Sequence, residues 1–184
     1  VMGGGDLKSI LTCPSCGSTN IETDSNNERN CMYRCENCRT RFGYKDYAEN
    51  EYSNKLMTFS MSVRRLLDDC FRIRVTKNKD EDGASFFITK NSIEKLIDGV
   101  LDKNQWNEFK SMLFNNLYLD KWKKLYFDPN CEDGIKWELE VTFEKKHALF
   151  FSGCNGYPIY WNGLLDVLKT FFPHKNQTYD EFRV

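Results

Sequence analysis

After residue 56, the chain consists of two kinds of segment, which differ in the period of their hydrophobic residues. Apolar and polar residues alternate, as in strands with one buried face, at residues 57–63, 70–75, 84–89, 137–143 and 147–152. Apolar residues recur at steps of three and four, as in helices, at residues 93–101, from Asn104 to Leu117, from Asp120 to Tyr126 and at 161–172. Ser92 and Asn104 are expected N-caps, and Pro173 stops the last helix. The pattern predicts an α+β fold, with an antiparallel sheet and helices packed on one face.

Residues before this region have a different composition. Residues 1–47 hold five of the eight cysteines, several turn formers and few aliphatic side chains. Residues 48–56 are polar and are expected to be a linker. The predicted organisation is a zinc ribbon at 1–47, a linker at 48–56 and an α+β domain at 57–184.

Composition and charge narrow the class of protein. The chain has 184 residues, of which 40% are hydrophobic and 15% aromatic, enough to build a core. The 26 basic and 27 acidic residues give a net charge of -1, which argues against a generally basic nucleic-acid coat but allows a local basic patch. No apolar run approaches the roughly 20 residues needed to cross a bilayer, and the N-terminus lacks the pattern of a signal peptide. We therefore expect a cytoplasmic protein without a membrane partner, and the richness in Asn and Lys favours a bacterial source.

The spacing of four cysteines predicts a metal site. Cys13 and Cys16 form one C-x-x-C pair, and Cys35 and Cys38 form a second pair 18 residues later. Two such pairs on tight turns complete a tetrahedron of thiolates at about 2.3 Å from a zinc ion. We expect one structural Zn²⁺, with iron as the alternative metal because four thiolates also bind iron. Cys31 is expected to be a free thiol, as are the widely spaced Cys70, Cys131 and Cys154.

The residues around these cysteines carry a resemblance. The segments Cys13-Pro14-Ser15-Cys16-Gly17-Ser18 and Tyr33-Arg34-Cys35-Glu36-Asn37-Cys38, the latter followed by Phe42, resemble the zinc ribbons of insertion-sequence transposases and prokaryotic regulators. The resemblance covers about residues 11–44. Ribbons of this kind accompany many unrelated domains, so the resemblance implies a module and its metal rather than one function.

A local basic patch makes nucleic acid a candidate partner. Between residues 28 and 45, five basic residues against Glu28 and Glu36 give a net charge of +3, and aromatic residues are interleaved with them. The candidate nucleic-acid-binding residues are Arg29, Arg34, Arg39, Arg41 and Lys45. The alternative is that the aromatic side chains pack beneath the metal while the arginines are solvated.

A second motif lies near the C-terminus. The segments Asp133-Gly134-Ile135-Lys136-Trp137-Glu138-Leu139-Glu140 and Ser152-Gly153-Cys154-Asn155-Gly156-Tyr157-Pro158 resemble a bacterial domain with D-G-x-x-W-x-L-E followed by S-G-x-N-x-Y-P. The resemblance implies a fold but no activity. We expect a tight strand-to-helix connection here. The alternative is a ligand pocket lined by Trp137, Asn155, Tyr157 and Trp161.

Catalytic motifs are missing from the sequence. There is no G-x-S-x-G, no H-E-x-x-H and no phosphate-binding glycine loop, and neither His147 nor His174 has an obvious nucleophile partner. Acidic residues that could hold a divalent ion are expected to face water: Asp68, Asp69, Asp80, Glu81 and Asp82. The sequence therefore predicts a non-catalytic protein that recognises nucleic acid or a protein partner. A docking module without nucleic acid is the second hypothesis, and an enzyme that uses the acidic residues is the third.

Overall fold

The computed structural model describes residues 11–23, 31–44, 51–64, 70–79, 82–91, 93–130, 134–173 and 179–184. The first two of these ranges form a ribbon of three short antiparallel strands in the order β1-β2-β3. The strands are β1 (Ile21–Thr23), β2 (Cys31–Cys35) and β3 (Arg41–Tyr44). The remaining ranges, from residue 51 onward, are called the α+β unit below.

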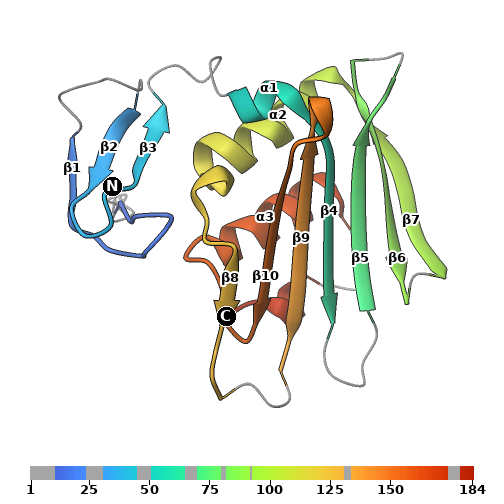
Figure 1. The fold of residues 1–184 in the computed structure, drawn as a ribbon. Coiled ribbons are helices and arrows are strands. Elements are labelled where there is room, and N and C mark those ends of the chain that lie inside the picture. The colour runs from blue at the N-terminus through green and yellow to red at the C-terminus, as the bar shows by residue number, and fades with distance from the viewer. Residues whose placement is uncertain are drawn as a thin grey trace, which may run out of the picture.

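A seven-stranded sheet in the order β7-β6-β5-β4-β9-β10-β8 forms the framework of the α+β unit (Figure 1). Its strands are β4 (Leu56–Arg64), β5 (Cys70–Lys77), β6 (Ala84–Lys90), β7 (Glu94–Leu101), β8 (Leu125–Phe127), β9 (Lys136–Phe143) and β10 (Ala148–Cys154). Neighbouring strands are antiparallel except β8 and β10, which are parallel. The predicted α+β class is confirmed, and the sheet is mixed at one edge.

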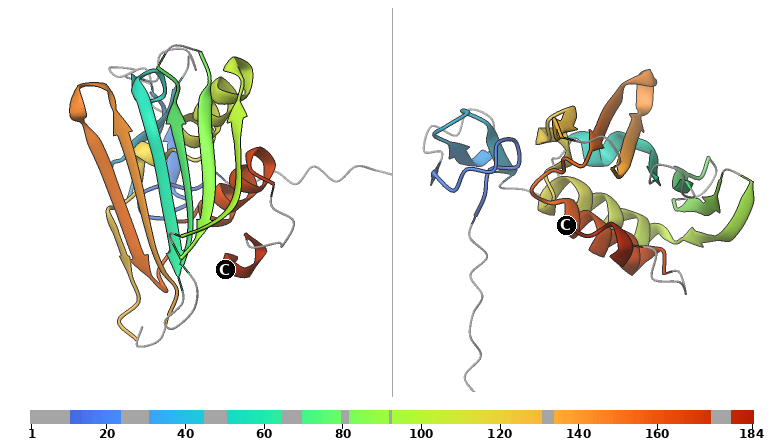
Figure 2. Two further views of the ribbon diagram at one scale, coloured as in Figure 1. Left: turned by 90° about the vertical axis from the view of Figure 1, so that its right-hand side faces the viewer. Right: turned by 90° about the horizontal axis from the view of Figure 1, so that it is seen from below.

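Helices cover one face of this sheet (Figure 2). The helices of the α+β unit are α1 (Glu51–Lys55), α2 (Lys103–Ser111) and α3 (Trp161–Phe171), and a π-helical turn (Met112–Asn116) extends α2. Strand residues that point toward α2 and α3, such as Phe59, Ile73 and Val141, are fully buried. The residues that alternate with them lie on the opposite face, called the open face below, which no helix of the described residues covers.

The segment 93–101 was predicted to be a helix, and that prediction is wrong. Residues Glu94–Leu101 form β7, which pairs with β6 in antiparallel register. Asn91 makes the connecting turn at φ 54°, and its Oδ1 accepts a hydrogen bond from the Cys70 backbone at 2.8 Å. Gly99 disfavours a helix and lies opposite Phe86, whose ring fills the space that a Cβ at residue 99 would occupy. Strand pairing therefore overrides the helical spacing of the apolar residues.

Two further segments differ from the expected elements. Part of the expected linker is structured, because residues 51–55 form α1 and Leu56 begins β4 with only 1% of its surface exposed. Residues 125–127, expected in a short helix from Asp120, form the edge strand β8 instead. The N-cap of α2 is Asp102 rather than Asn104, since its carboxylate accepts from Gln105 N at 2.9 Å. Ser92 lies outside the described residues.

Candidate metal centre

Two turns of the ribbon bring the four predicted cysteines together. The sulfur atoms of Cys13 and Cys38 are 3.6 Å apart, as are those of Cys16 and Cys35, and all four lie within 4.8 Å of one another. Four sulfurs arranged tetrahedrally at about 2.3 Å from one ion would be about 3.8 Å apart. The cluster therefore has the dimensions of a four-thiolate metal site. Four sulfur donors suit zinc, and also iron, better than a hard cation such as magnesium.

The two turns share the same backbone pattern. In the first, Cys13 N donates to Ser18 O at 2.8 Å and Gly17 N donates to Cys13 O at 2.9 Å. In the second, Cys35 N donates to Thr40 O and Arg39 N donates to Cys35 O, both at 2.9 Å.

The fifth residue of each turn has a left-handed backbone. Gly17 has φ +73° and Arg39 has φ +63°. Glycine adopts this conformation without a Cβ clash, whereas arginine does so at a cost of roughly 1–2 kcal/mol. The second turn is thus built like the first, although its sequence lacks the glycine.

Three of the thiols, Cys13, Cys16 and Cys38, differ in acidity. Burial raises the pKa of Cys13 to about 12 and also raises the pKa of Cys16. Burial acts in the same direction on Cys38, but hydrogen bonds from the Thr40 hydroxyl and backbone, and from the other thiols, together lower its pKa to about 6. In the metal-free cluster, Cys38 therefore loses its proton more readily than Cys13 and Cys16, which hold theirs more tightly. A metal ion that binds here displaces those protons, so its affinity rises with pH.

A small aromatic core lies beneath the cysteines and continues into the α+β unit. Cys13, Cys35 and Phe42 are fully buried, and the half-buried Tyr33 packs on Phe42 at 5.7 Å between ring centroids. Tyr118 of the α+β unit also packs on Phe42, with their ring centroids 5.3 Å apart. These contacts place the ribbon beside the β8 edge of the sheet (Figure 1).

A second contact joins the two parts close to the metal ligands. The Tyr160 hydroxyl donates to Thr12 O at 2.9 Å, one residue before Cys13. Tyr118 and Tyr160 also contact each other at 5.7 Å between ring centroids. Nothing in the local sequence marks these two tyrosines, because their contacts with the ribbon join residues more than 70 positions apart.

The candidate nucleic-acid-binding arginines are largely engaged within the ribbon. The Arg34 guanidinium forms ion pairs with the carboxylates of Glu22 and Glu36, at N–O distances of 2.9 and 3.0 Å. Arg39 forms an ion pair with Glu36 at an N–O distance of 3.2 Å. Nε of Arg41 is buried. Arg29 and Lys45 lie outside the described residues.

The residues of the alternative pocket form a packed connection from β10 to α3. Trp137 and Trp161 are buried with their ring centroids 4.9 Å apart, and Tyr157 packs on Trp161 at 5.1 Å. Trp137 Nε1 donates to Gly156 O at 2.9 Å, and Asn155 Oδ1 accepts from Ile135 N at 2.9 Å. Trp137 also contributes to the lining of a cavity on the open face.

Glycines permit the close approaches in this connection. A Cβ on Gly134 would lie 2.3 Å from the Asn155 side chain, and one on Gly153 would lie 2.3 Å from Trp137 Nε1. Both glycines belong to the C-terminal motif, whose residues thus meet in space.

Among the described residues, the remaining cysteines and the acidic candidates do not belong to the four-cysteine cluster. Cys70 is a free thiol, as expected, but Cys154 is disulfide-bonded, so the expectation of a free thiol there was wrong. Of the acidic candidates, Asp82 contacts Lys103 at 2.7 Å. The remaining candidates lie outside the described part of the chain: the Cys31 side chain, Asp68, Asp69, Asp80, Glu81, Cys131 and His174.

The fold and the four thiols define the class of this protein: an α+β protein with a ribbon whose four cysteines could hold a metal ion. A scan against protein-family models, a search of curated proteins and a search of solved structures each return no match. Among the described residues, no helix has both the length and the apolar character needed to span a membrane.

Proposed function

We propose that this protein is a non-catalytic zinc-ribbon protein that recognises nucleic acid. The observation that carries the zinc assignment is the cluster of four cysteine sulfurs within 4.8 Å of one another, on two turns of the same construction. A fully thiolate donor set and the small core of Cys13, Cys35 and Phe42 fit a metal that stabilises the ribbon rather than one that reacts.

Nucleic acid is the partner that the charges and the resemblance to transposase ribbons favour. Arg39 remains 64% exposed although it contacts Glu36, and phosphate groups compete well for such exposed arginines. The contacts at Phe42 and Thr12 hold the ribbon at the edge of the α+β unit, so both parts can contribute to one surface.

A reducing cytoplasm would keep the four thiols available for the metal. Labelling of free thiols in protein isolated under acid quench tests that location. In a reducing cytoplasm, Cys154 would react as a free thiol, because the disulfide it forms in the structure would be reduced.

The docking hypothesis without nucleic acid has one observation in its favour. Glu22 and Glu36 form ion pairs with Arg34, and Glu36 also forms an ion pair with Arg39. These ion pairs reduce the positive potential of the ribbon.

Binding of the zinc-loaded full chain to single- and double-stranded oligonucleotides distinguishes the two hypotheses. Salt concentrations of about 50 and about 200 mM should give markedly different affinities if phosphates are contacted. Metal analysis of the same sample should give one zinc per chain. Absence of binding to both probes at the lower salt concentration would reject the nucleic-acid hypothesis and leave the docking hypothesis.

A further inference from the structure

The open face of the sheet carries an ordered row of polar side chains. Across neighbouring strands, Arg72 of β5 pairs with Ser62 of β4, Ser62 pairs with Glu138 of β9, and Glu138 pairs with Ser152 of β10. One step nearer the strand ends, Arg64 lies opposite Lys136. Small serines thus alternate with long charged side chains, and this difference in size leaves a hollow.

A cavity of about 340 Å³ lies at this hollow. The side chains that can bind a ligand there are three cations, Arg64, Arg72 and Lys136, and the two serine hydroxyls of Ser62 and Ser152. The size suits a small organic ligand. It is too small to enclose a folded partner.

The described residues place no acidic side chain within ion-pair distance of the cations of the cavity. Within the described residues, Arg64, Arg72 and Lys136 form no ion pair, and Glu138 is the one carboxylate that lines the cavity. Other basic side chains with a described position do form ion pairs, as Lys103 does with Asp82 at 2.7 Å. Three cations around one hollow repel one another, and an anion that binds among them relieves the repulsion.

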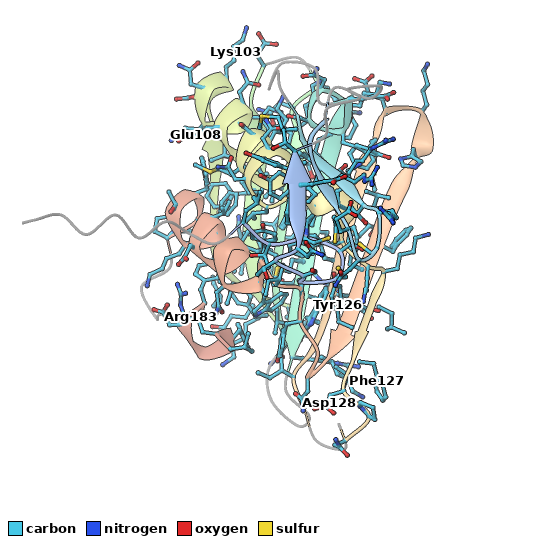
Figure 3. The ribbon with its side chains drawn as sticks, turned by 90° about the vertical axis from the view of Figure 1, so that its left-hand side faces the viewer. Lys103, Glu108, Tyr126, Phe127, Asp128 and Arg183 are labelled. Carbon is cyan, nitrogen blue, oxygen red and sulfur yellow. The ribbon has the colours of Figure 1, made fainter. Side chains whose placement is uncertain are left out.

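One wall of the cavity is apolar. Leu125 and Phe127 of β8 line it, and their side chains are 65% and 59% exposed. Figure 3 places Phe127 beside Asp128 at the end of β8, on the side of the sheet away from α3 and Arg183. An exposed aromatic ring next to clustered cations is the combination that binds the base and the phosphate of a nucleotide.

We propose that this cavity binds a nucleoside phosphate. Arg64, Arg72 and Lys136 hold the phosphate, and Phe127 stacks on the base. The ligand is either a free nucleotide or a nucleotide within a single strand, since both present the same groups. The proposal shares with the proposed function only the class of partner, because its residues lie on the open face and not on the ribbon.

The chain offers a matched control for the phosphate contact. Arg74 is two residues from Arg72 on the same strand and face, is exposed and free of ion pairs within the described residues, and does not line the cavity. We expect Arg72→Gln to weaken the binding of adenosine monophosphate about tenfold, because a charge-assisted contact is lost. Arg74→Gln should change it less than twofold. Both residues are exposed, so both variants should fold, and thermal unfolding checks this.

Two phenylalanines provide a matched test of the base contact. Phe127 lines the cavity and is 59% exposed, whereas Phe150 on the same face is 60% exposed and lies outside it. We expect Phe127→Ala to weaken the binding of adenosine monophosphate about tenfold while leaving any binding of inorganic phosphate unchanged. Phe150→Ala should leave both unchanged.

Calorimetric titration of the zinc-loaded protein and these variants tests the proposal. The four ligands are adenosine monophosphate, inorganic phosphate, an acidic peptide and an oligo-dA strand. Tighter binding of the strand than of the mononucleotide, weakened by Arg72→Gln, assigns the ligand to a strand. Tighter or equal binding of the mononucleotide assigns it to a free nucleotide. Any of three results overturns the proposal. Arg72→Gln and Arg74→Gln weaken nucleotide binding equally, the protein binds the peptide more tightly than the nucleotides, or it binds neither adenosine monophosphate nor the strand. Strand binding that survives Arg72→Gln overturns it while leaving the proposed function of the ribbon intact.

Discussion

Phe42 of the ribbon lies edge-on against Tyr118 of the α+β unit, with ring centroids 5.3 Å apart and an interplanar angle of 72°. Phe42 is fully buried and belongs to the same small core as the metal ligands Cys13 and Cys35. Tyr118 therefore contributes a wall to the ribbon core from outside the ribbon. The stability of the metal centre should therefore depend on a residue from outside the ribbon.

We expect Tyr118→Ala to speed the loss of zinc from the ribbon. The edge-on pair contributes about 0.5–1.5 kcal/mol beyond the area it buries, which corresponds to a rate about twofold to tenfold higher. Zinc release to a coloured chelator measures the rate. Tyr160→Phe is the control, since it removes only the hydrogen bond to Thr12 and keeps the ring contact with Tyr118. Equal release from wild type and Tyr118→Ala would show that the ribbon is stable without this contact.

Removal of the metal should unfold the ribbon and spare the α+β unit. Within the described residues, the hydrophobic core of the ribbon consists of three buried residues, so metal binding supplies most of its folding free energy. The core of the α+β unit is much larger. In amide proton spectra, chelation should collapse the signals of residues 11–44 toward random-coil positions while those of β4, β5 and β9 stay dispersed. Ribbon signals that keep their dispersion after complete metal removal would contradict a structural role for the metal.

The fifth residue of each metal-binding turn provides a reciprocal test. Gly17 has open space around its Cα, so Gly17→Ala introduces no clash and only imposes the left-handed conformation on a residue with a Cβ. We expect it to lower the free energy of unfolding of the zinc-loaded ribbon by about 1 kcal/mol. Arg39→Gly should do the reverse, raising that free energy by up to about 1 kcal/mol, because the lost contact with Glu36 is exposed and weak. Thermal unfolding monitored at the ribbon signals gives both values, and changes of the same sign would contradict the equivalence of the two turns.

The parts of the fold that are encoded locally could be predicted from the sequence. Alternation along 57–63 and 137–143 places one face in the core, and β4 and β9 follow it. The C-x-x-C spacing likewise identifies Cys13, Cys16, Cys35 and Cys38, which the structure brings together.

The features that escaped prediction depend on contacts between distant residues. β7 forms because β6 offers a pairing edge and because Phe86 fills the space beside Gly99, although the apolar spacing of 93–101 is helical. The left-handed backbone of Arg39 has no sequence signal, since glycine is the residue that marks it. The contact between Phe42 and Tyr118, and the cavity beside Arg72, likewise exist only once the strands are assembled.

A substitution at Gly153 should test the structural role of the C-terminal motif. A Cβ there would lie 2.3 Å from Trp137 Nε1 and 2.5 Å from Gly156 O, and neither group can move without breaking their mutual hydrogen bond. We expect Gly153→Ala to lower the free energy of unfolding by about 3 kcal/mol. Gly163→Ala in α3 is the control, because its Cβ meets only the flexible end of Leu117 and alanine favours a helix. Chemical denaturation compares the two, and a Gly153→Ala variant as stable as wild type would remove the packing explanation of the motif.

Alkaline pH should destabilise the α+β unit through the half-buried Tyr126 and the buried Tyr179. Burial raises the pKa of Tyr126 to about 12, and burial also raises the pKa of Tyr179, whose hydroxyl donates to Phe172 O at 2.9 Å. Below pH 10, both residues are protonated in the folded and the unfolded chain, so their contribution is fully present. Above pH 10, the unfolded chain loses these protons first, and stability falls as pH rises through the folded pKa values.

The expected slope is up to about 1.4 kcal/mol per pH unit for each of these tyrosines, and it should appear between about pH 10 and 12. Urea unfolding at intervals across this range measures it. Tyr126→Phe removes one titrating group and keeps the ring that packs on Trp137, so its slope should be shallower than that of wild type by one group's share. Parallel curves for wild type and Tyr126→Phe would show that Tyr126 ionises as readily in the folded protein as in the unfolded chain, contrary to its half-buried position on Trp137.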